Sequence, residues 1–242
     1  MRAAAKGATS RGAKSAAPLP DLPSHPEQTR RSSPLPTRFE EELLGTLGSR
    51  DASRYRERLA MAESAFRRER YFDVRRTLAP LMAELAGVAS ARELYGLTLY
   101  RLGKWRAAAG ELEAYRTLSG SVEHLPVLAD CYRAMRRHAK VAELWTELKE
   151  ASPSAAVVAE GRIVMAGSLA DRGDVRGAIA LLRPSGVMPR RLRDHHIRTW
   201  YVLADLYDRS GDATAARQLF GRIRDVAPDF ADVDDRLAAL GR

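Results

Sequence analysis

The sequence predicts an all-α fold in which antiparallel helix pairs stack one on the next. Two observations support this class: a ladder of side chains that recurs along the chain, and apolar residues at helical intervals within each recurrence. The clearest ladder is Tyr207, Ala216, Phe220 and Pro228, whose members lie nine, four and eight residues apart. Such a recurrence indicates that one structural unit is repeated.

Four earlier copies of the ladder precede this one. Tyr132, Val141, Trp145 and Pro153 repeat it in full. Its nine-and-four part recurs at Leu99, Ala108 and Leu112, at Leu169, Ala178 and Leu182, and less well at Ala65, Val74 and Leu78. The first members, at positions 65, 99, 132, 169 and 207, are 34, 33, 37 and 38 residues apart. A period in this range is typical of stacked helical arrays, which favours binding over catalysis.

Composition narrows the class of protein. Hydrophobic residues make up 45% of the 242 residues, which is enough for a continuous core. No run approaches the roughly 18–20 apolar residues of a membrane span, and the first residues do not resemble a signal peptide. The single cysteine, Cys131, excludes an internal disulfide and a thiolate zinc cluster. The lack of a membrane span and of a signal peptide leads us to expect a cytoplasmic protein. The 35 Arg, 5 Lys and absence of Asn lead us to expect a bacterial origin.

Residues 1–37 are predicted to be a disordered basic tail rich in Pro, Ala and Ser, and residues 38–242 a helical repeat domain. Six prolines between positions 18 and 36 interrupt any helix, and large apolar side chains are almost absent. Residues 1–38 hold seven basic and two acidic residues, a net charge of +5, whereas the other 204 residues carry only +4. The tail therefore makes the protein basic.

The helical elements begin with a short amphipathic helix over 38–47, with Thr37 as its N-cap. A first pair spans 58–85, with Glu69 in place of a turn glycine and with Pro80, which should shorten or kink its second helix. Pro126 requires the first helix of the third pair to begin close to it. A loop containing Pro184, Pro189 and three arginines should precede the last pair.

The last pair has the clearest signals. Trp200, Leu203, Ala204 and Tyr207 form one apolar stripe of a helix. Gly211 provides a permissive turn, and Asp212 is the expected N-cap of the next helix. A terminal helix over 229–240 has an acidic first turn and a polar face, which suits a cap on the open end of an array.

The segment Trp200–Pro228 resembles a tetratricopeptide repeat, because it matches that family's order of Trp, Leu, small residue, Tyr, Ala, Phe and Pro. Tyr95–Tyr115 and Ala129–Pro153 match well, and Ala170–Pro184 matches mainly in its turn and second helix. The resemblance covers roughly residues 55–228 and implies a right-handed α-solenoid. It also implies a non-catalytic scaffold or adaptor that holds a protein or peptide in a concave groove.

In that family the groove is lined by the first helices of successive pairs. The corresponding residues here combine aromatic rings with charges of both signs. The predicted groove residues are Phe66, Arg67, Tyr100, Arg101, Asp130, Arg133, Tyr201, Asp205 and Arg209, together with Glu63, Leu97, Gly167, Asp171 and Asp208. Aromatic rings would anchor an apolar side chain, and arginines would hold an acidic group. The alternative is that these side chains are solvated or paired within the chain.

No catalytic constellation, cofactor or metal site is expected. The adjacent His195 and His196 point about 100° apart on a helix, unlike metal ligands at i and i+4. Cys131 lies beside a buried stripe and is expected to be a core residue. No phosphate loop is present. The family's chaperone-binding members clamp a carboxylate with lysines and asparagines, and the lack of asparagine disfavours that role here.

A second interpretation assigns function to the tail. Its basic side chains would neutralise phosphates of a nucleic acid or ribosome, with strongly salt-dependent affinity. These candidate contacts are Arg2, Lys6, Arg11, Lys14, Arg30 and Arg31. Against this interpretation, the tail has no aromatic residue to stack on bases before Phe39. The identity of the partner is not encoded in any motif of the chain.

Overall fold

The computed structural model describes residues 37–183 and 191–241, and within these ranges the secondary structure is entirely helical. The α-helices are α1 (Thr37–Arg67), α2 (Tyr71–Leu78), α3 (Ala89–Arg101), α4 (Trp105–Ser119), α5 (Leu125–Ala134), α6 (His138–Ala151), α7 (Ala155–Asp171), α8 (Val175–Leu182), α9 (Asp194–Ser210), α10 (Ala213–Val226) and α11 (Val233–Leu240). A 3₁₀ helix, Ala79–Leu81, follows α2. The predicted all-α class is confirmed.

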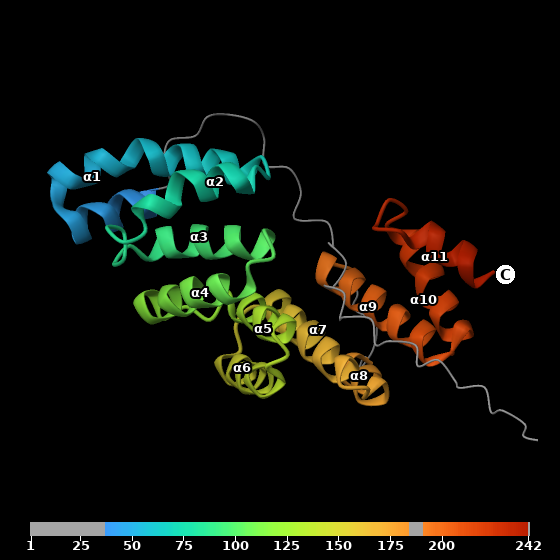
Figure 1. Cartoon of the computed structure of the whole chain (residues 1–242). Helices are drawn as coiled ribbons and strands as arrows, with labels where there is room; N and C mark the ends of the chain where they lie inside the picture. The colour runs from blue at the N-terminus through green and yellow to red at the C-terminus, as the bar shows by residue number, and fades with distance from the viewer. Residues whose placement is uncertain (1–36, 184–190, 242) are drawn as a thin grey trace, which may run out of the picture.

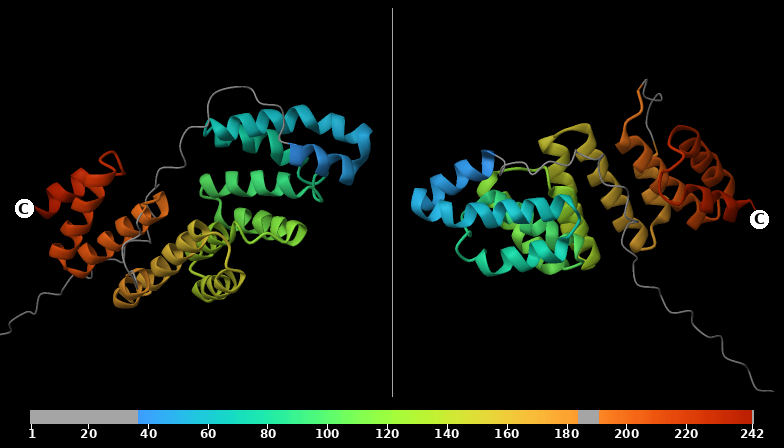
Figure 2. Two further views of the ribbon diagram at one scale, coloured as in Figure 1. Left: turned by 180° about the vertical axis from the view of Figure 1, so that it is seen from behind. Right: turned by 90° about the horizontal axis from the view of Figure 1, so that it is seen from above.

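The helices form five consecutive antiparallel pairs that stack into a right-handed solenoid (Figure 1). The first helices of the pairs are α1, α3, α5, α7 and α9, and α11 follows the last pair. The stack is curved: α1–α4 lie at one end, α9–α11 at the other, and α5–α8 join them (Figure 2). Among the helices of the described ranges, none combines the length and the apolar character that a membrane span requires.

The first pair bears out two expectations from the sequence. Gly48, with φ 74°, kinks α1, so the segment before it is a separate short helix whose Phe39 and Leu43 are buried. Its Glu42 accepts hydrogen bonds from the backbone N–H and the hydroxyl of Ser90, which fasten it to the start of α3. Pro80 lies in the 3₁₀ helix that ends α2, and therefore shortens this second helix.

Small or β-branched residues recur at two equivalent buried positions of each pair, one on each helix. In the second helices, the residue at this position is fully buried in all five pairs: Val74, Ala108, Val141, Ala178 and Ala216 each have 0% exposure. The first helices contribute Ala62, Gly96, Ala129, Ala166 and Ala204, all of which are buried. A Cβ at Gly96 would lie 3.1 Å from the Leu112 side chain, which is closer than most Cβ contacts, so α3 packs closely against α4 at this glycine.

The turn inside each pair contains, at the same position, one residue with a left-handed backbone conformation. Its φ is 57° at Glu69, 67° at Gly103, 58° at Arg136, 87° at Gly173 and 86° at Gly211. Glycine adopts this conformation without a steric cost, whereas other residues have a Cβ close to the carbonyl oxygen. Glu69 and Arg136 are therefore strained positions in a turn geometry that the other three pairs make with glycine.

The N-caps of the second helices divide the array into two parts. In the last two pairs, Asp174 and Asp212 accept hydrogen bonds from Gly177 N–H at 2.8 Å and Ala215 N–H at 3.0 Å. In the first three pairs the N-cap residues are Arg70, Lys104 and Arg137, which make no side-chain cap. All five have φ between −84° and −89° and ψ between 58° and 70°, so an aspartate would fit each. A missing cap costs about 1 kcal/mol.

The C-terminal helix begins later than the sequence predicts. Residues 229–232 form turns, and α11 starts at Val233 instead of position 229. The reason is tertiary, because Phe230 packs edge-on against the ring of Tyr201, and Asp232 accepts a hydrogen bond from the Tyr201 hydroxyl. These contacts hold the segment against α9 and delay the helix.

We predict that Ala108→Leu destabilises the protein and that its neighbour Ala107→Leu does not. Ala108 is fully buried at the tightest contact of its pair, whereas Ala107 is exposed on the same helix. Overpacking should lower the free energy of unfolding by about 1–3 kcal/mol for Ala108→Leu. Urea denaturation of both variants measures the difference, and equal stability of the two would mean that the pair contact tolerates larger side chains.

We also predict that Glu69→Gly stabilises the chain and Gly173→Ala destabilises it. Relief of the left-handed strain at Glu69, less the greater freedom of glycine in the unfolded chain, should amount to about 0.5–1 kcal/mol. Gly173→Ala introduces the same strain and should shift the stability in the opposite direction. Thermal unfolding followed by circular dichroism tests both, and a lower midpoint for Glu69→Gly would contradict the assignment of strain.

Candidate functional site

The row of first helices is held together by a buried polar ladder of four side chains: Tyr100, Asp130, Arg133 and Asp171. The Tyr100 hydroxyl on α3 donates to Asp130 Oδ2 on α5 at 2.8 Å. Arg133 Nε donates to Asp130 Oδ1 at 2.7 Å, and its Nη1 donates to Asp171 Oδ2 on α7 at 2.8 Å. The ladder therefore ties three successive first helices through side chains that were predicted to face a ligand.

The arginine of the ladder packs close to α7. A Cβ at Gly167 would be in ordinary van der Waals contact with Arg133, 3.4 Å from its Cδ and 3.5 Å from its Nε. Asp130 and Arg133 are each only 4% exposed. His138 adds a second connection between neighbouring pairs, since its Nδ1 lies 2.8 Å from the Ser168 hydroxyl. The middle of the row is thus braced by buried contacts in which one cation lies between two carboxylates.

The electrostatics of the ladder favour its present protonation state. Burial and the adjacent Asp130 carboxylate raise the pKa of Tyr100 far above that of a free phenol. Burial by itself lowers the pKa of Arg133, but Asp130 and Asp171 more than offset that effect, so its pKa is raised. The tyrosine stays neutral and the arginine stays charged at any physiological pH. The ladder is a structural brace and has no group poised for proton transfer.

The C-terminal end of the row is covered by the last helix. Tyr201 is buried, and its ring packs on Phe220 with 5.6 Å between ring centroids. Arg236 on α11 pairs with Asp205 at 2.5 Å and with Asp208 at 3.3 Å. Three predicted groove residues of α9 therefore contact the chain's own cap. Arg209, one turn further on, is exposed and lies 3.8 Å from Asp205.

The N-terminal end of the row is more open. Phe66 is partly buried, and its ring meets Tyr71 edge-on with 5.4 Å between centroids. The Arg101 guanidinium lies over the same cluster, 5.9 Å from the centre of the Tyr71 ring. Arg67 is exposed next to them. Of the predicted groove residues, Arg67, Arg101 and Arg209 are exposed, and Phe66 is partly buried beside Arg67.

Residues with catalytic potential are buried or dispersed. Cys131 has 0% exposure, and burial followed by the charge of Asp130 raises the pKa of its thiol to about 12. The rings of His195 and His196 lie 4.1 Å apart in the first turn of α9. Among the described residues no group of three or more His, Cys, Asp or Glu could hold a metal ion. Burial therefore keeps the Cys131 thiol protonated at neutral pH.

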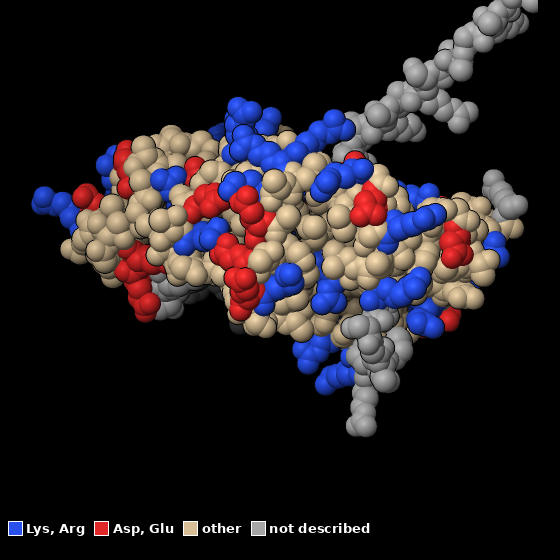
Figure 3. Space-filling model, turned by 90° about the horizontal axis from the view of Figure 1, so that it is seen from below, with Lys and Arg blue, Asp and Glu red and all other residues tan. Residues whose placement is uncertain are grey.

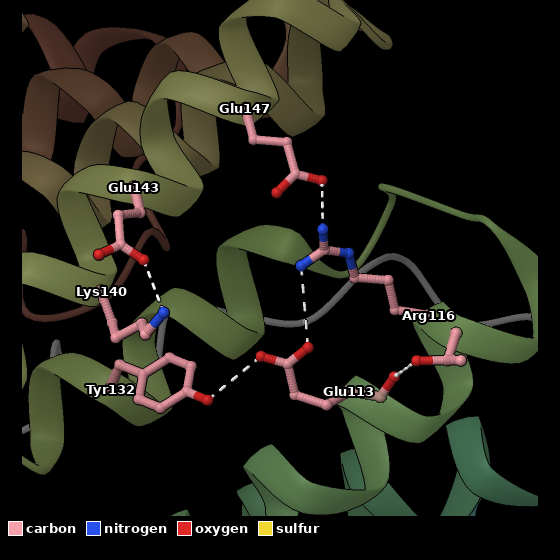
Figure 4. A network of polar contacts seen from close by, with 7 residues as sticks. Glu113, Arg116, Tyr132, Lys140, Glu143 and Glu147 are labelled. Atoms are coloured by element: carbon pink, nitrogen blue, oxygen red, sulfur yellow. Dashed lines mark hydrogen bonds and ion pairs between the residues drawn. The ribbon is translucent and has the colours of Figure 1, made fainter.

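A polar network on the second helices was not anticipated from the sequence (Figure 4). Arg116 of α4 pairs with Glu147 of α6 at 2.7 Å, and Glu113 accepts from the Tyr132 hydroxyl at 3.1 Å. Beside it lies a shallow, open depression along α6, lined by Ala139, Ala142, Glu143, Thr146, Glu147 and Glu150. The sequence pattern that could have predicted this depression is the alternation of small and acidic residues at i, i+3 and i+4 along α6.

We compared the chain with known proteins. No family model matches the sequence, and no curated protein is significantly similar to it. Among solved structures, a thermophilic TPR protein of Thermus thermophilus superposes with a TM-score of 0.57 and 17% sequence identity. The match covers 76% of this chain and 97% of the other. The chain has the tetratricopeptide-repeat fold. The structural likeness confirms the fold that the recurring sequence spacing predicts. The binding role of each predicted groove residue stays a prediction.

We predict that Arg133→Ala is strongly destabilising. It leaves two carboxylates of the ladder without their cation in a buried site, which should cost about 3–5 kcal/mol in the free energy of unfolding. A triple variant, Arg133→Met with Asp130→Asn and Asp171→Asn, removes all three charges and should recover most of that loss. Calorimetric melting compares them, and a stable Arg133→Ala protein would show that the ladder is not a brace.

Proposed function

We propose that this protein is a non-catalytic scaffold that binds a protein or peptide partner on the face of its first helices. The observation that carries the proposal is the braced row itself. The polar ladder and the ion pair of Arg198 with Glu160, at 2.6 Å and 2.9 Å, hold four successive first helices in fixed relative positions. A surface that is ordered before binding loses little conformational entropy when a partner docks.

The two ends of the row supply the expected contacts. At the N-terminal end, Phe66 offers an aromatic ring beside the exposed cation of Arg67. At the C-terminal end, Arg209 lies beside the Asp205 and Asp208 carboxylates. We infer that a ligand anchors an apolar group near Phe66 and pairs charges at the far end, while the braced middle of the row provides shape. Aromatic and arginine anchors of this kind commonly dominate binding energy.

The remaining expectations of the sequence belong to the same proposal. A bacterial origin, a cytoplasmic location and the lack of a cofactor suit a TPR-type adaptor. The tail residues Arg2, Lys6, Arg11, Lys14, Arg30 and Arg31 lie outside the described residues, so their binding of phosphate stays a prediction. The same holds for Arg190 in the loop before the last pair.

Site-specific photo-crosslinking tests the proposal. A photoreactive phenylalanine analogue is placed at Phe66 or Arg209 on the first helices, and at Glu150 on α6 as the matched control. We expect crosslinks to one protein species from the first two positions and none from the control, in nuclease-treated lysate. Crosslinks from Glu150 alone, or equally from all three positions, would move the binding surface away from the first helices.

A further inference from the structure

The turns of the first three pairs carry a cluster of positive charge, of which the proposed groove uses only the side chains of Arg67 and Arg101. The segments 67–70, 101–106 and 134–137 contain eight basic residues and a single carboxylate, Glu69. We name these eight the basic edge: Arg67, Arg68, Arg70, Arg101, Lys104, Arg106, Arg136 and Arg137. All eight are exposed. In the corresponding turns of the last two pairs, arginines are balanced by the carboxylates of Asp171, Asp174, Asp208 and Asp212.

The three turns are neighbours in space. The Arg101 guanidinium lies over the Tyr71 ring, which joins the second turn to the first. Tyr100 contacts Trp105 edge-on, with 5.5 Å between centroids, and its hydroxyl reaches Asp130 on α5, which joins the second turn to the third pair. Figure 3 shows one face of the molecule, on which Lys and Arg side chains lie on both sides of a central band of Asp and Glu.

Most of this charge is not neutralised within the protein. Arg70 pairs with Asp73 at 2.5 Å, and Arg101 is engaged with Tyr71. The other six side chains form no salt bridge with a carboxylate in the described ranges 37–183 and 191–241. A ridge of like charges repels itself, so a stable protein retains one only at a cost.

The basic edge also occupies positions where other residues would stabilise the fold. Arg70, Lys104 and Arg137 take the N-cap position that Asp174 and Asp212 fill with a hydrogen bond in the other pairs, at the same backbone conformation. A cation there also faces the positive end of the helix dipole. Arg136 adopts the left-handed conformation that glycine takes in three other turns. Local rules broken together at one surface are typical of a functional site.

We propose that the basic edge binds the phosphate backbone of a single-stranded nucleic acid without preference for base sequence. Seven of the eight cations are arginines, whose planar fork matches phosphate oxygens. Phe72, which is 74% exposed in the first turn of α2, presents a ring face on which an unpaired base stacks. An acidic protein partner is less suited, because such interfaces need an apolar centre and Phe72 is an isolated exposed ring here.

The salt dependence of binding follows from the number of contacts. Five phosphate contacts to a single strand reduce affinity by about 100-fold between 50 and 200 mM salt. Binding of a fluorescent 20-nucleotide oligouridylate or oligothymidylate to the full-length protein, followed by anisotropy, measures this slope. A slope close to zero would overturn the proposal.

The decisive variants replace basic residues at the uncapped helix starts by aspartate. Lys104→Asp combined with Arg137→Asp should add two N-cap hydrogen bonds while it removes two cations. We expect a higher midpoint of thermal unfolding together with at least tenfold weaker binding of the oligonucleotide. Lys104→Asn with Arg137→Asn should likewise raise the midpoint and weaken binding to a smaller degree. A merely structural role for these residues cannot produce opposite changes in stability and affinity.

Three controls separate the edge from other sources of attraction. Arg58→Glu with Arg224→Glu makes the same change of net charge at exposed sites on α1 and α10, and should alter affinity less than twofold. Arg30→Gln with Arg31→Gln tests the tail in the full-length chain.

The proposal is wrong if the cap-restoring variant binds like the wild type, if the distant charge control weakens binding equally, or if only the tail variant loses affinity. A polyglutamate peptide that competes as well as the oligonucleotide would also overturn it, in favour of an acidic protein. None of these outcomes depends on the crosslinking result for the first helices.

Discussion

Close approach of the two helices within each pair governs the geometry of the whole array. A fully buried small or β-branched residue lies on the second helix of all five pairs, and a buried alanine or glycine lies at an equivalent position on each first helix. Small side chains at these positions let the two helices of a pair pack closely, and the repeated pairs then bring successive first helices side by side. Ladders of polar contacts between pairs are possible only because the spacing is the same at every step.

The buried polar ladder changes how the predicted groove should be understood. Side chains that a family resemblance assigns to a ligand, Asp130 and Arg133 above all, are satisfied within the chain here. Their burial makes the middle of the first-helix row a brace, and we therefore propose that a partner contacts the ends of the row. Partly buried Phe66 and exposed Arg209 are the more informative positions for binding studies.

The array is also asymmetric from one end to the other. Its last two pairs use aspartate caps and glycine turns, which are the locally favourable choices, whereas its first three pairs place arginine or lysine at the same N-cap positions. The turn geometry is the same throughout the chain while the chemistry at it is not. We therefore propose two binding surfaces: a braced face that binds a polypeptide and a charged edge that binds a polyanion.

The amino-acid sequence alone accounts for the repeat, because the nine-and-four spacing of buried residues is a local pattern that each pair must satisfy on its own. It also accounts for the shortened helix at Pro80, the start of α5 next to Pro126, and the Asp212 cap, each of which rests on the geometry of one residue and its near neighbours.

Tertiary packing determines instead which polar side chains of the first helices contact one another. Tyr100 and Asp130, or Arg133 and Asp171, are 30 and 38 residues apart in sequence, and their contact depends on how one pair is rotated against the next. The same holds for the late start of α11, which Tyr201 imposes from a neighbouring helix. Local periodicity therefore determines each helix pair. The placement of one pair on the next depends on the packing of many side chains that are far apart in the sequence, so no short stretch of sequence determines it.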